Sequence, residues 1–195
     1  MSNVNKYLVD GLDFLGKSSL VTGIQHKRGF HQAIHFSKPQ ILEAYKPVLS
    51  NLPGDVVKRE MLYQYQRGSF LNLFEILRSP NAKIICDRAH LGEAVYSNLY
   101  RGYDGAYVFD LEKDMGMSEN VRTRLILLTE DFSCSMHFKD DGLSFDVSKR
   151  EQEQDLFLAA FEKSIIRDKR IVCVTDPSTG GFKSKDVILA EVLNG

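Results

Sequence analysis

The stretch GLDFLGKS, from Gly11 to Ser18, matches the phosphate-binding pattern GxxxxGK[ST] at every fixed position. In this pattern Gly11 allows a tight turn after a strand, and Gly16 lets backbone amides approach a phosphate. Lys17 would reach the outer phosphates, and Ser18 would offer a hydroxyl to Mg²⁺ at the start of a helix. A strand-like run precedes the motif and a helical pattern follows it, as the motif requires. The sequence therefore predicts a nucleotide-binding loop.

The variable positions of this loop carry larger residues than phosphate loops usually have. The side chains of Phe14 and Leu15 can point away from a phosphate, so they do not exclude binding. Asp13 is either a turn-forming residue that hydrogen-bonds backbone or a carboxylate for a substrate hydroxyl or for Mg²⁺. We expect ATP to contact the loop and the serine after it, at Gly11, Asp13, Phe14, Leu15, Gly16, Lys17, Ser18 and Ser19.

Short apolar runs, each ending in a polar residue, predict the strands. Four of them are continuous, which is typical of parallel strands covered on both faces: YLV before Asp10, KIIC before Asp87, LILL before Thr129 and IVCV before Thr175. QAIHF, Gln32–Phe36, is a fifth and weaker strand.

Helical patterns separate these runs, at Ser18–Ile24, Pro39–Leu49, Val56–Leu77, Glu151–Ile166 and Asp186–Leu193. This alternation predicts an α/β fold, a doubly wound five-stranded parallel sheet flanked by helices, in one domain spanning residues 1–195. Ligands of such sheets bind beyond the carboxyl ends of the strands. Tyr103–Asn120 and Phe138–Lys149 are expected to be loops.

Composition limits the function classes. The formal net charge is −1, so no overall field draws the chain to DNA or to an anionic membrane. The sequence has no apolar run long enough for a membrane span and no apolar signal-peptide core. The three cysteines have no CxxC spacing, which favours a reducing, cytoplasmic setting. None of the five histidines has metal-ligand spacing, and His90 is the only one expected near the site.

Two further motifs point to a family. Asp87 and Arg88 open the stretch DRAHLGEAVY, and YQYQR places Tyr63 four residues before Arg67. With GLDFLGKSS, these stretches resemble the thymidylate kinase family of P-loop nucleoside monophosphate kinases, whose loop reads roughly GxDGxGKTT and whose third strand ends in DRYxxSxxAY. The chain would be a divergent member, such as a phage-type deoxynucleoside monophosphate kinase. The resemblance covers roughly residues 7–100 and is looser beyond.

The resemblance implies roles on the acceptor side. Arg88 would grip the acceptor monophosphate, and Asp13 would meet its 3′-hydroxyl. Tyr63 would stack on the base and Arg67 would hydrogen-bond it, while Tyr96 would close the 2′ side of the sugar. Phe36, in FSKP, would complete the acceptor site. Without the resemblance, Arg67 reads as a surface charge, and the tyrosines read as packing residues.

On the donor side, Lys17 would bind the ATP phosphates, and Ser18 with Asp87 would hold Mg²⁺. The loop lacks the arginine that some family members use as a transition-state cation. The resemblance then implies a cation from a lid-like loop at about 138–150, with Lys139, Lys149 and Arg150 as candidates and Arg122 or Arg124 as outsiders. Our expected catalytic residues are Lys17, Asp13, Arg88 and Arg150.

Departures from the family pattern surround the acceptor: Ser37 and Lys38 where Arg and Glu are usual, Ala89 for an aromatic, and Gly92 for a serine. They leave the acceptor base open. The implied activity is transfer of the γ-phosphoryl of ATP to a deoxynucleoside monophosphate, dTMP or a related or modified pyrimidine, in nucleotide biosynthesis, by an enzyme that is commonly a homodimer. The alternatives are a P-loop kinase acting on a DNA base or end, and a non-catalytic nucleotide-binding regulatory module.

Overall fold

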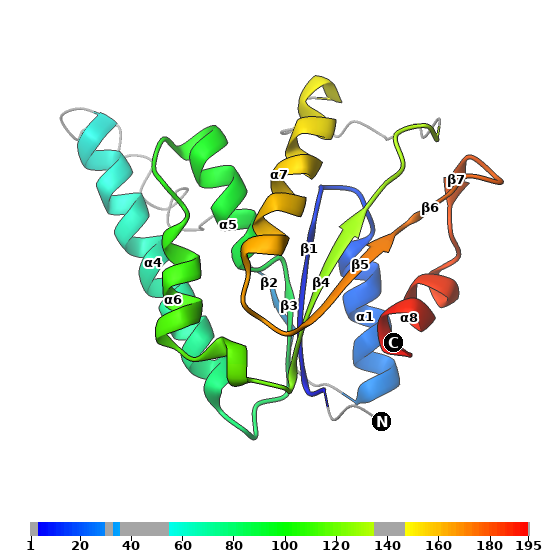
Figure 1. Cartoon of the computed structure of the whole chain (residues 1–195), viewed down its shortest axis with the longest axis horizontal. Helices are drawn as coiled ribbons and strands as arrows, with labels where there is room; N and C mark the ends of the chain where they lie inside the picture. Colours follow the sequence, from blue (N-terminus) through cyan, green and yellow to red (C-terminus); the bar gives the residue numbers. More distant parts are fainter. Residues whose placement is uncertain (1–3, 30–32, 36–54, 135–146, 195) are drawn as a thin grey trace.

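A five-stranded parallel sheet forms the centre of the computed structural model, which describes residues 4–29, 33–35, 55–134 and 147–194. The strand order is β2-β3-β1-β4-β5 (Figure 1). The strands are β1 Lys6–Gly11, β2 Ala33–His35, β3 Ile84–Asp87, β4 Thr123–Thr129 and β5 Asp168–Cys173. The α/β doubly wound fold predicted from the sequence is confirmed.

The continuous apolar runs become the buried strands of the sheet. Every residue of β1, β3 and β4 is buried, because helices cover both faces of these strands. β5 differs from the expectation, since it is an edge strand and Ile171 is 47% exposed. Cys173, expected to be buried, is likewise only partly covered.

Helices cover the two faces of the sheet, with α1 and α8 together on one side and α5 and α7 on the other, where α4 and α6 pack beyond them (Figure 1). Their bounds are α1 Lys17–Arg28, α4 Asp55–Arg78, α5 His90–Tyr96, α6 Tyr107–Asp114, α7 Arg150–Lys163 and α8 Lys185–Leu193. Short turns add the π-helical η1 Ser97–Arg101 and the 3-10 segments η2 Met117–Glu119 and η3 Val147–Lys149. The predicted helix at residues 39–49 lies outside the described residues.

The expectation of a loop over 103–120 is wrong. This stretch contains α6 and η2, because Tyr107, Val108, Leu111 and Met117 are apolar at helical spacing and join the core. The C-terminal region also contains an unexpected pair of antiparallel strands, β6 Thr175–Asp176 and β7 Gly181–Phe182. No helix among the described residues is long and apolar enough to cross a membrane.

Candidate active site

The predicted chemical residues gather at one edge of the sheet. The phosphate loop follows β1, Asp87 ends β3 with Arg88 directly after it, and Glu130 follows β4. Parallel pairing sets Val9 beside Asp87 and Gly11 beside Leu128, so all these residues lie at the carboxyl ends of adjacent strands. Ligands of doubly wound sheets bind at this edge. The strand pattern in the sequence therefore predicted correctly that these residues lie together.

Close packing of the loop on the sheet explains Gly11. Its φ is +135°, and a Cβ added there would lie 2.4 Å from the carbonyl oxygen of Leu128. Gly16 also has a positive φ, of 80°, at the start of α1, and a Cβ there would meet open space. Gly11 thus serves close packing and a left-handed turn, whereas Gly16 serves the turn alone.

Lys17 is folded back into the loop. Its Nζ donates to the carbonyl oxygens of Gly11 at 2.8 Å and Leu12 at 2.5 Å. Burial lowers the pKa of Lys17, and the nearby Asp13 carboxylate opposes that shift. Because burial disfavours the charged form of Lys17, a bound anion would stabilise its ammonium group.

Asp13 joins the loop to the end of β3. Its Oδ1 lies 2.8 Å from Arg88 Nη2 and 3.4 Å from Lys17 Nζ. Two cations thus share one carboxylate oxygen, which offsets the repulsion that a carboxylate inside a phosphate loop would cause. Two predicted phosphate-binding cations are brought together here, Lys17 from the start of α1 and Arg88 from the turn after β3.

Two residues of the site adopt backbone conformations that residues other than glycine rarely take. Phe14 and Arg88 both have φ of 67°. At Arg88, the amide donates to the Val9 carbonyl at 2.9 Å, which anchors this turn to β1. Such conformations cost on the order of 1 kcal/mol and concentrate at functional sites. Phe14 is 39% exposed, whereas Leu15 packs into the core, so the Leu15 side chain does point away from the loop's concave side.

Ser18 and Asp87 form a pair of oxygen ligands that fits the predicted Mg²⁺ role. The Ser18 hydroxyl donates to Asp87 Oδ2 at 2.5 Å, while Asp87 Oδ1 is buried without a hydrogen-bond partner. Mg²⁺ prefers oxygen ligands and commonly takes only one or two from the protein, with phosphate and water completing its shell. The described residues contain no cluster of three or more His, Cys, Asp or Glu that could hold a metal unaided.

His35 also lies at this pair, which the sequence reasoning missed. Its Nδ1 is 3.2 Å from Asp87 Oδ2, at the end of β2. His90, the histidine expected near the site, is instead fully buried with Nε2 2.6 Å from Glu112 Oε1. The position of His35 at the carboxyl end of a predicted strand was the signal available for finding it.

Arg150 lies against the phosphate loop from α7. Its Nη2 donates to the Asp13 carbonyl at 2.9 Å, and its Nε donates to Glu130 Oε1. Glu130 was not a candidate from the sequence, because its contact depends on how α7 packs over β4. The catalytic role of Arg150 stays a prediction, but its place beside the loop is clear.

The other cation candidates differ in position. Lys149 Nζ lies over the Tyr100 ring, 5.9 Å from its centroid. Lys139 and Phe36 lie outside the described residues. Arg122 contacts the Pro80 carbonyl, and Arg124 pairs with Asp168. Both arginines lie at the start of β4, so they are at the amino-terminal ends of the strands, opposite the candidate site. The structure therefore excludes these two arginines as cations for the site.

Tyr96, the last residue of α5, packs edge-on against Phe157 of α7, with ring centroids 5.5 Å apart. Burial raises the pKa of the Tyr96 hydroxyl, and the Asp13 charge adds to that shift. The ring thus packs as an ordinary core aromatic while its hydroxyl stays within electrostatic reach of the loop. Its sugar contact stays a prediction.

Tyr63 lies in an aromatic cluster between α4 and α6. Its ring is edge-on to Tyr103 and Tyr107, with centroids 5.7 and 5.1 Å away. The hydroxyls of these two tyrosines donate to Glu93 Oε1 at 2.7 and 2.9 Å. Arg67 is exposed one helical turn after Tyr63. Tyr63 borders a cavity of about 470 Å³, but its stacking on a base remains a prediction.

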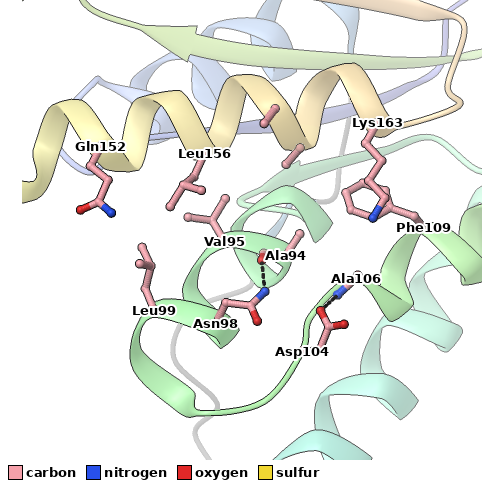
Figure 2. A pocket seen from close by; sticks show the side chains of 12 residues that line it. Ala94, Val95, Asn98, Leu99, Asp104, Ala106, Phe109, Gln152, Leu156 and Lys163 are labelled. Atoms are coloured by element: carbon pink, nitrogen blue, oxygen red, sulfur yellow. Dashed lines mark hydrogen bonds between the residues drawn. The ribbon is translucent and has the colours of Figure 1, made fainter.

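A second hollow, of about 560 Å³, lies between α5, α6 and α7 (Figure 2). Leu156 of α7 faces Val95 of α5 across it, and Lys163 lies over the Phe109 ring. None of the residues predicted to bind nucleotide lines this hollow. It is therefore separate from the candidate active site.

Comparisons with solved structures agree with this architecture. The chain is similar to the YorR protein of Bacillus subtilis, solved in complex with phosphorylated GDP, with a TM-score of 0.64 and 13% identity over 97% of this chain and 94% of that one. It is also similar to thymidylate kinase from Candida albicans, with a TM-score of 0.51 and 17% identity over 98% and 90% of the two chains. No protein-family model and no curated protein sequence matches the chain. At these identities the likeness establishes the fold alone, which is the doubly wound α/β arrangement that the chain shares with both proteins.

Proposed function

We propose that this protein is an ATP-dependent kinase that phosphorylates a deoxynucleoside monophosphate, dTMP or a related pyrimidine, to the diphosphate. The observation that carries the proposal is the meeting of Lys17 and Arg88 on Asp13, at 3.4 and 2.8 Å. Two cations placed together suit a reaction that brings two phosphate groups into line. The fold shared with a thymidylate kinase supports this choice.

In the proposed reaction, Lys17 exchanges its bonds to loop carbonyls for the outer phosphates of ATP. The planar guanidinium of Arg88 grips the acceptor monophosphate through paired hydrogen bonds. The Asp13 carboxylate, then released by both cations, accepts a hydrogen bond from the sugar hydroxyl. Mg²⁺, held by Ser18 and Asp87, would supply charge neutralisation on the donor phosphates.

The test is ADP release from ATP and Mg²⁺, measured with a panel of deoxy- and ribonucleoside monophosphates and with oligonucleotides. We expect stimulation by deoxypyrimidine monophosphates. Stimulation by oligonucleotides alone would favour a kinase of DNA bases or ends, and ATP binding without stimulation by any acceptor would favour a regulatory module. Either result would overturn the proposal.

Arg88→Ala gives a sharper test of the acceptor assignment. This variant should raise the KM for the monophosphate by about a hundredfold, because a charged hydrogen-bonding pair is lost, and should leave the KM for ATP nearly unchanged. Arg78→Ala is the control, since Arg78 is an exposed cation at the far end of α4. An unchanged monophosphate KM in Arg88→Ala would remove Arg88 from the acceptor site.

A further inference from the structure

Glu130 is fixed at the end of β4 by the first turns of α7. Its amide donates to Gln154 Oε1 at 2.8 Å, and Gln154 Nε2 donates back to its carbonyl at 3.0 Å. Both backbone hydrogen-bonding groups of Glu130 are therefore satisfied by one side chain. This pairing sets the position from which the Glu130 carboxylate acts.

The Glu130 carboxylate in turn holds Arg150, and Arg150 holds the phosphate loop. Glu130 Oε1 accepts from Arg150 Nε, and the same guanidinium donates through Nη2 to the Asp13 carbonyl at 2.9 Å. The two side chains are only 3% and 4% exposed. A guanidinium is planar, so fixing its Nε side fixes the direction of its Nη2 donor.

The loop is thus held at Asp13 from two directions. Its carbonyl binds Arg150 from α7, and its carboxylate binds Arg88 from the turn after β3. The carbonyl contact uses backbone, so it does not depend on the position of the Asp13 side chain. The link from Glu130 through Arg150 is then what keeps the middle of the loop in place.

We propose that Glu130 is a positioning residue, which holds Arg150 so that Arg150 fixes the phosphate loop in the shape that receives the phosphates of ATP. This inference rests on the proposed function for its kinetic meaning, but its structural content concerns the loop alone. It also gives Arg150 a task other than that of a mobile transition-state cation.

The charge on Glu130 is essential to this arrangement. Burial raises the pKa of Glu130, and Arg150 opposes the shift by pairing with the carboxylate. Replacing the carboxylate by an amide would remove the negative charge that Glu130 places against a buried guanidinium, which is unfavourable. Arg150 would then turn toward water and release the Asp13 carbonyl.

Glu130→Gln tests the proposal, with Glu151→Gln as the matched control because Glu151 is an exposed carboxylate on the first turn of α7. We expect Glu130→Gln to weaken binding of a non-hydrolysable ATP analogue with Mg²⁺ by about tenfold, the size of one charged hydrogen bond, and to raise the KM for ATP but not the KM for the monophosphate. Hydrogen exchange should accelerate in the 11–18 segment and stay unchanged in β5. Glu151→Gln should change none of these quantities.

The double variant Glu130→Gln/Arg150→Gln keeps the proposal testable if the single variant folds poorly, since it removes the buried guanidinium together with the carboxylate. Its ATP-analogue affinity should fall no further than that of Glu130→Gln, because the two residues act as one unit. Wild-type affinity and exchange rates in both Glu130 variants would overturn the proposal. If the wild type binds the analogue but phosphorylates no monophosphate, the proposed function fails, and the binding and exchange results still decide the role of Glu130.

Discussion

At the residue scale, the site combines groups that are unfavourable to the fold unless a ligand compensates them. Lys17 is buried, which lowers its pKa, and Arg88 adopts a left-handed backbone conformation. Asp87 keeps one buried oxygen without a hydrogen-bond partner. Such costs are expected where residues are kept for chemistry and not for stability.

Lys17→Met should separate these two roles. Phosphoryl transfer should fall at least about a hundredfold, because a cation aimed at the transferring phosphates is lost. The melting temperature without nucleotide should not fall, because a buried charge is removed. Lys27→Met, on the exposed last turn of α1, should change neither quantity. A Lys17→Met variant with wild-type turnover would contradict the assignment.

At the element scale, α5 is anchored by two buried carboxylates whose pKa values are shifted in opposite directions. Asp10 Oδ2 accepts from the Leu91 amide at 3.1 Å, and burial raises the pKa of Asp10. Glu112 is also buried, but His90 and hydrogen bonds from Ser164 and Ile165 hold its pKa below the ordinary value. The helix that follows Arg88 is thus fixed to β1 at one point, and at another to α6 and, through Glu112, to the segment after α7.

These shifts predict opposite pH dependences of stability. The raised pKa of Asp10 means that its contribution is largest below its unfolded value of 3.8 and is lost as pH rises through the folded pKa. Asp10→Asn should therefore gain free energy of unfolding over wild type as pH rises toward 7. The lowered pKa of Glu112 gives a contribution that is present above 4.5 and lost as pH falls.

Glu112→Gln should accordingly lose about 3 kcal/mol at pH 7, the cost of breaking a buried pair, and the loss should shrink in acid. Urea unfolding from pH 3 to pH 7 measures both variants. The difference in free energy of unfolding between variant and wild type should change with pH in opposite directions for the two variants. A change in the same direction would contradict one of the two pKa shifts.

The close packing of β1 against β4 leads to a second prediction about the elements of the fold. Gly11→Ala should lower the free energy of unfolding by more than about 2 kcal/mol, because the new methyl would overlap the Leu128 carbonyl and φ is positive. Gly68→Ala is the control, since its Cβ would meet nothing within 4 Å in the interior of α4. It should stabilise by about 0.5–1 kcal/mol. Equal effects in chemical denaturation would contradict the close approach.

The elements that the sequence predicted correctly are those whose signal is local. Continuous apolar runs specified β1, β3 and β4, and a glycine-rich motif between a strand and a helix specified the loop. α6 was missed because polar residues and glycines surround its three buried apolar positions, and its burial is decided by α4 and α5. The exposure of β5 likewise depends on its place at the edge of the sheet.

At the scale of the whole molecule, parallel strands bring distant parts of the chain to one edge. Lys17, Asp87 and Arg88 could be predicted because each directly follows a strand or belongs to the loop motif. The contact of Arg150 with Glu130 and Asp13 could not, since it depends on the angle at which α7 crosses the sheet. The burial of Leu15 could not be predicted either, because it depends on how the loop packs against the core.

Transfer of labelled phosphate tests the central claim most directly. The protein would be incubated with ATP labelled at the γ-phosphate, Mg²⁺ and dTMP, and the products separated by chromatography. The proposed function predicts labelled dTDP, formed in step with ADP and absent with Lys17→Met. Labelled inorganic phosphate alone, or no release of label with any deoxynucleoside monophosphate, would contradict it.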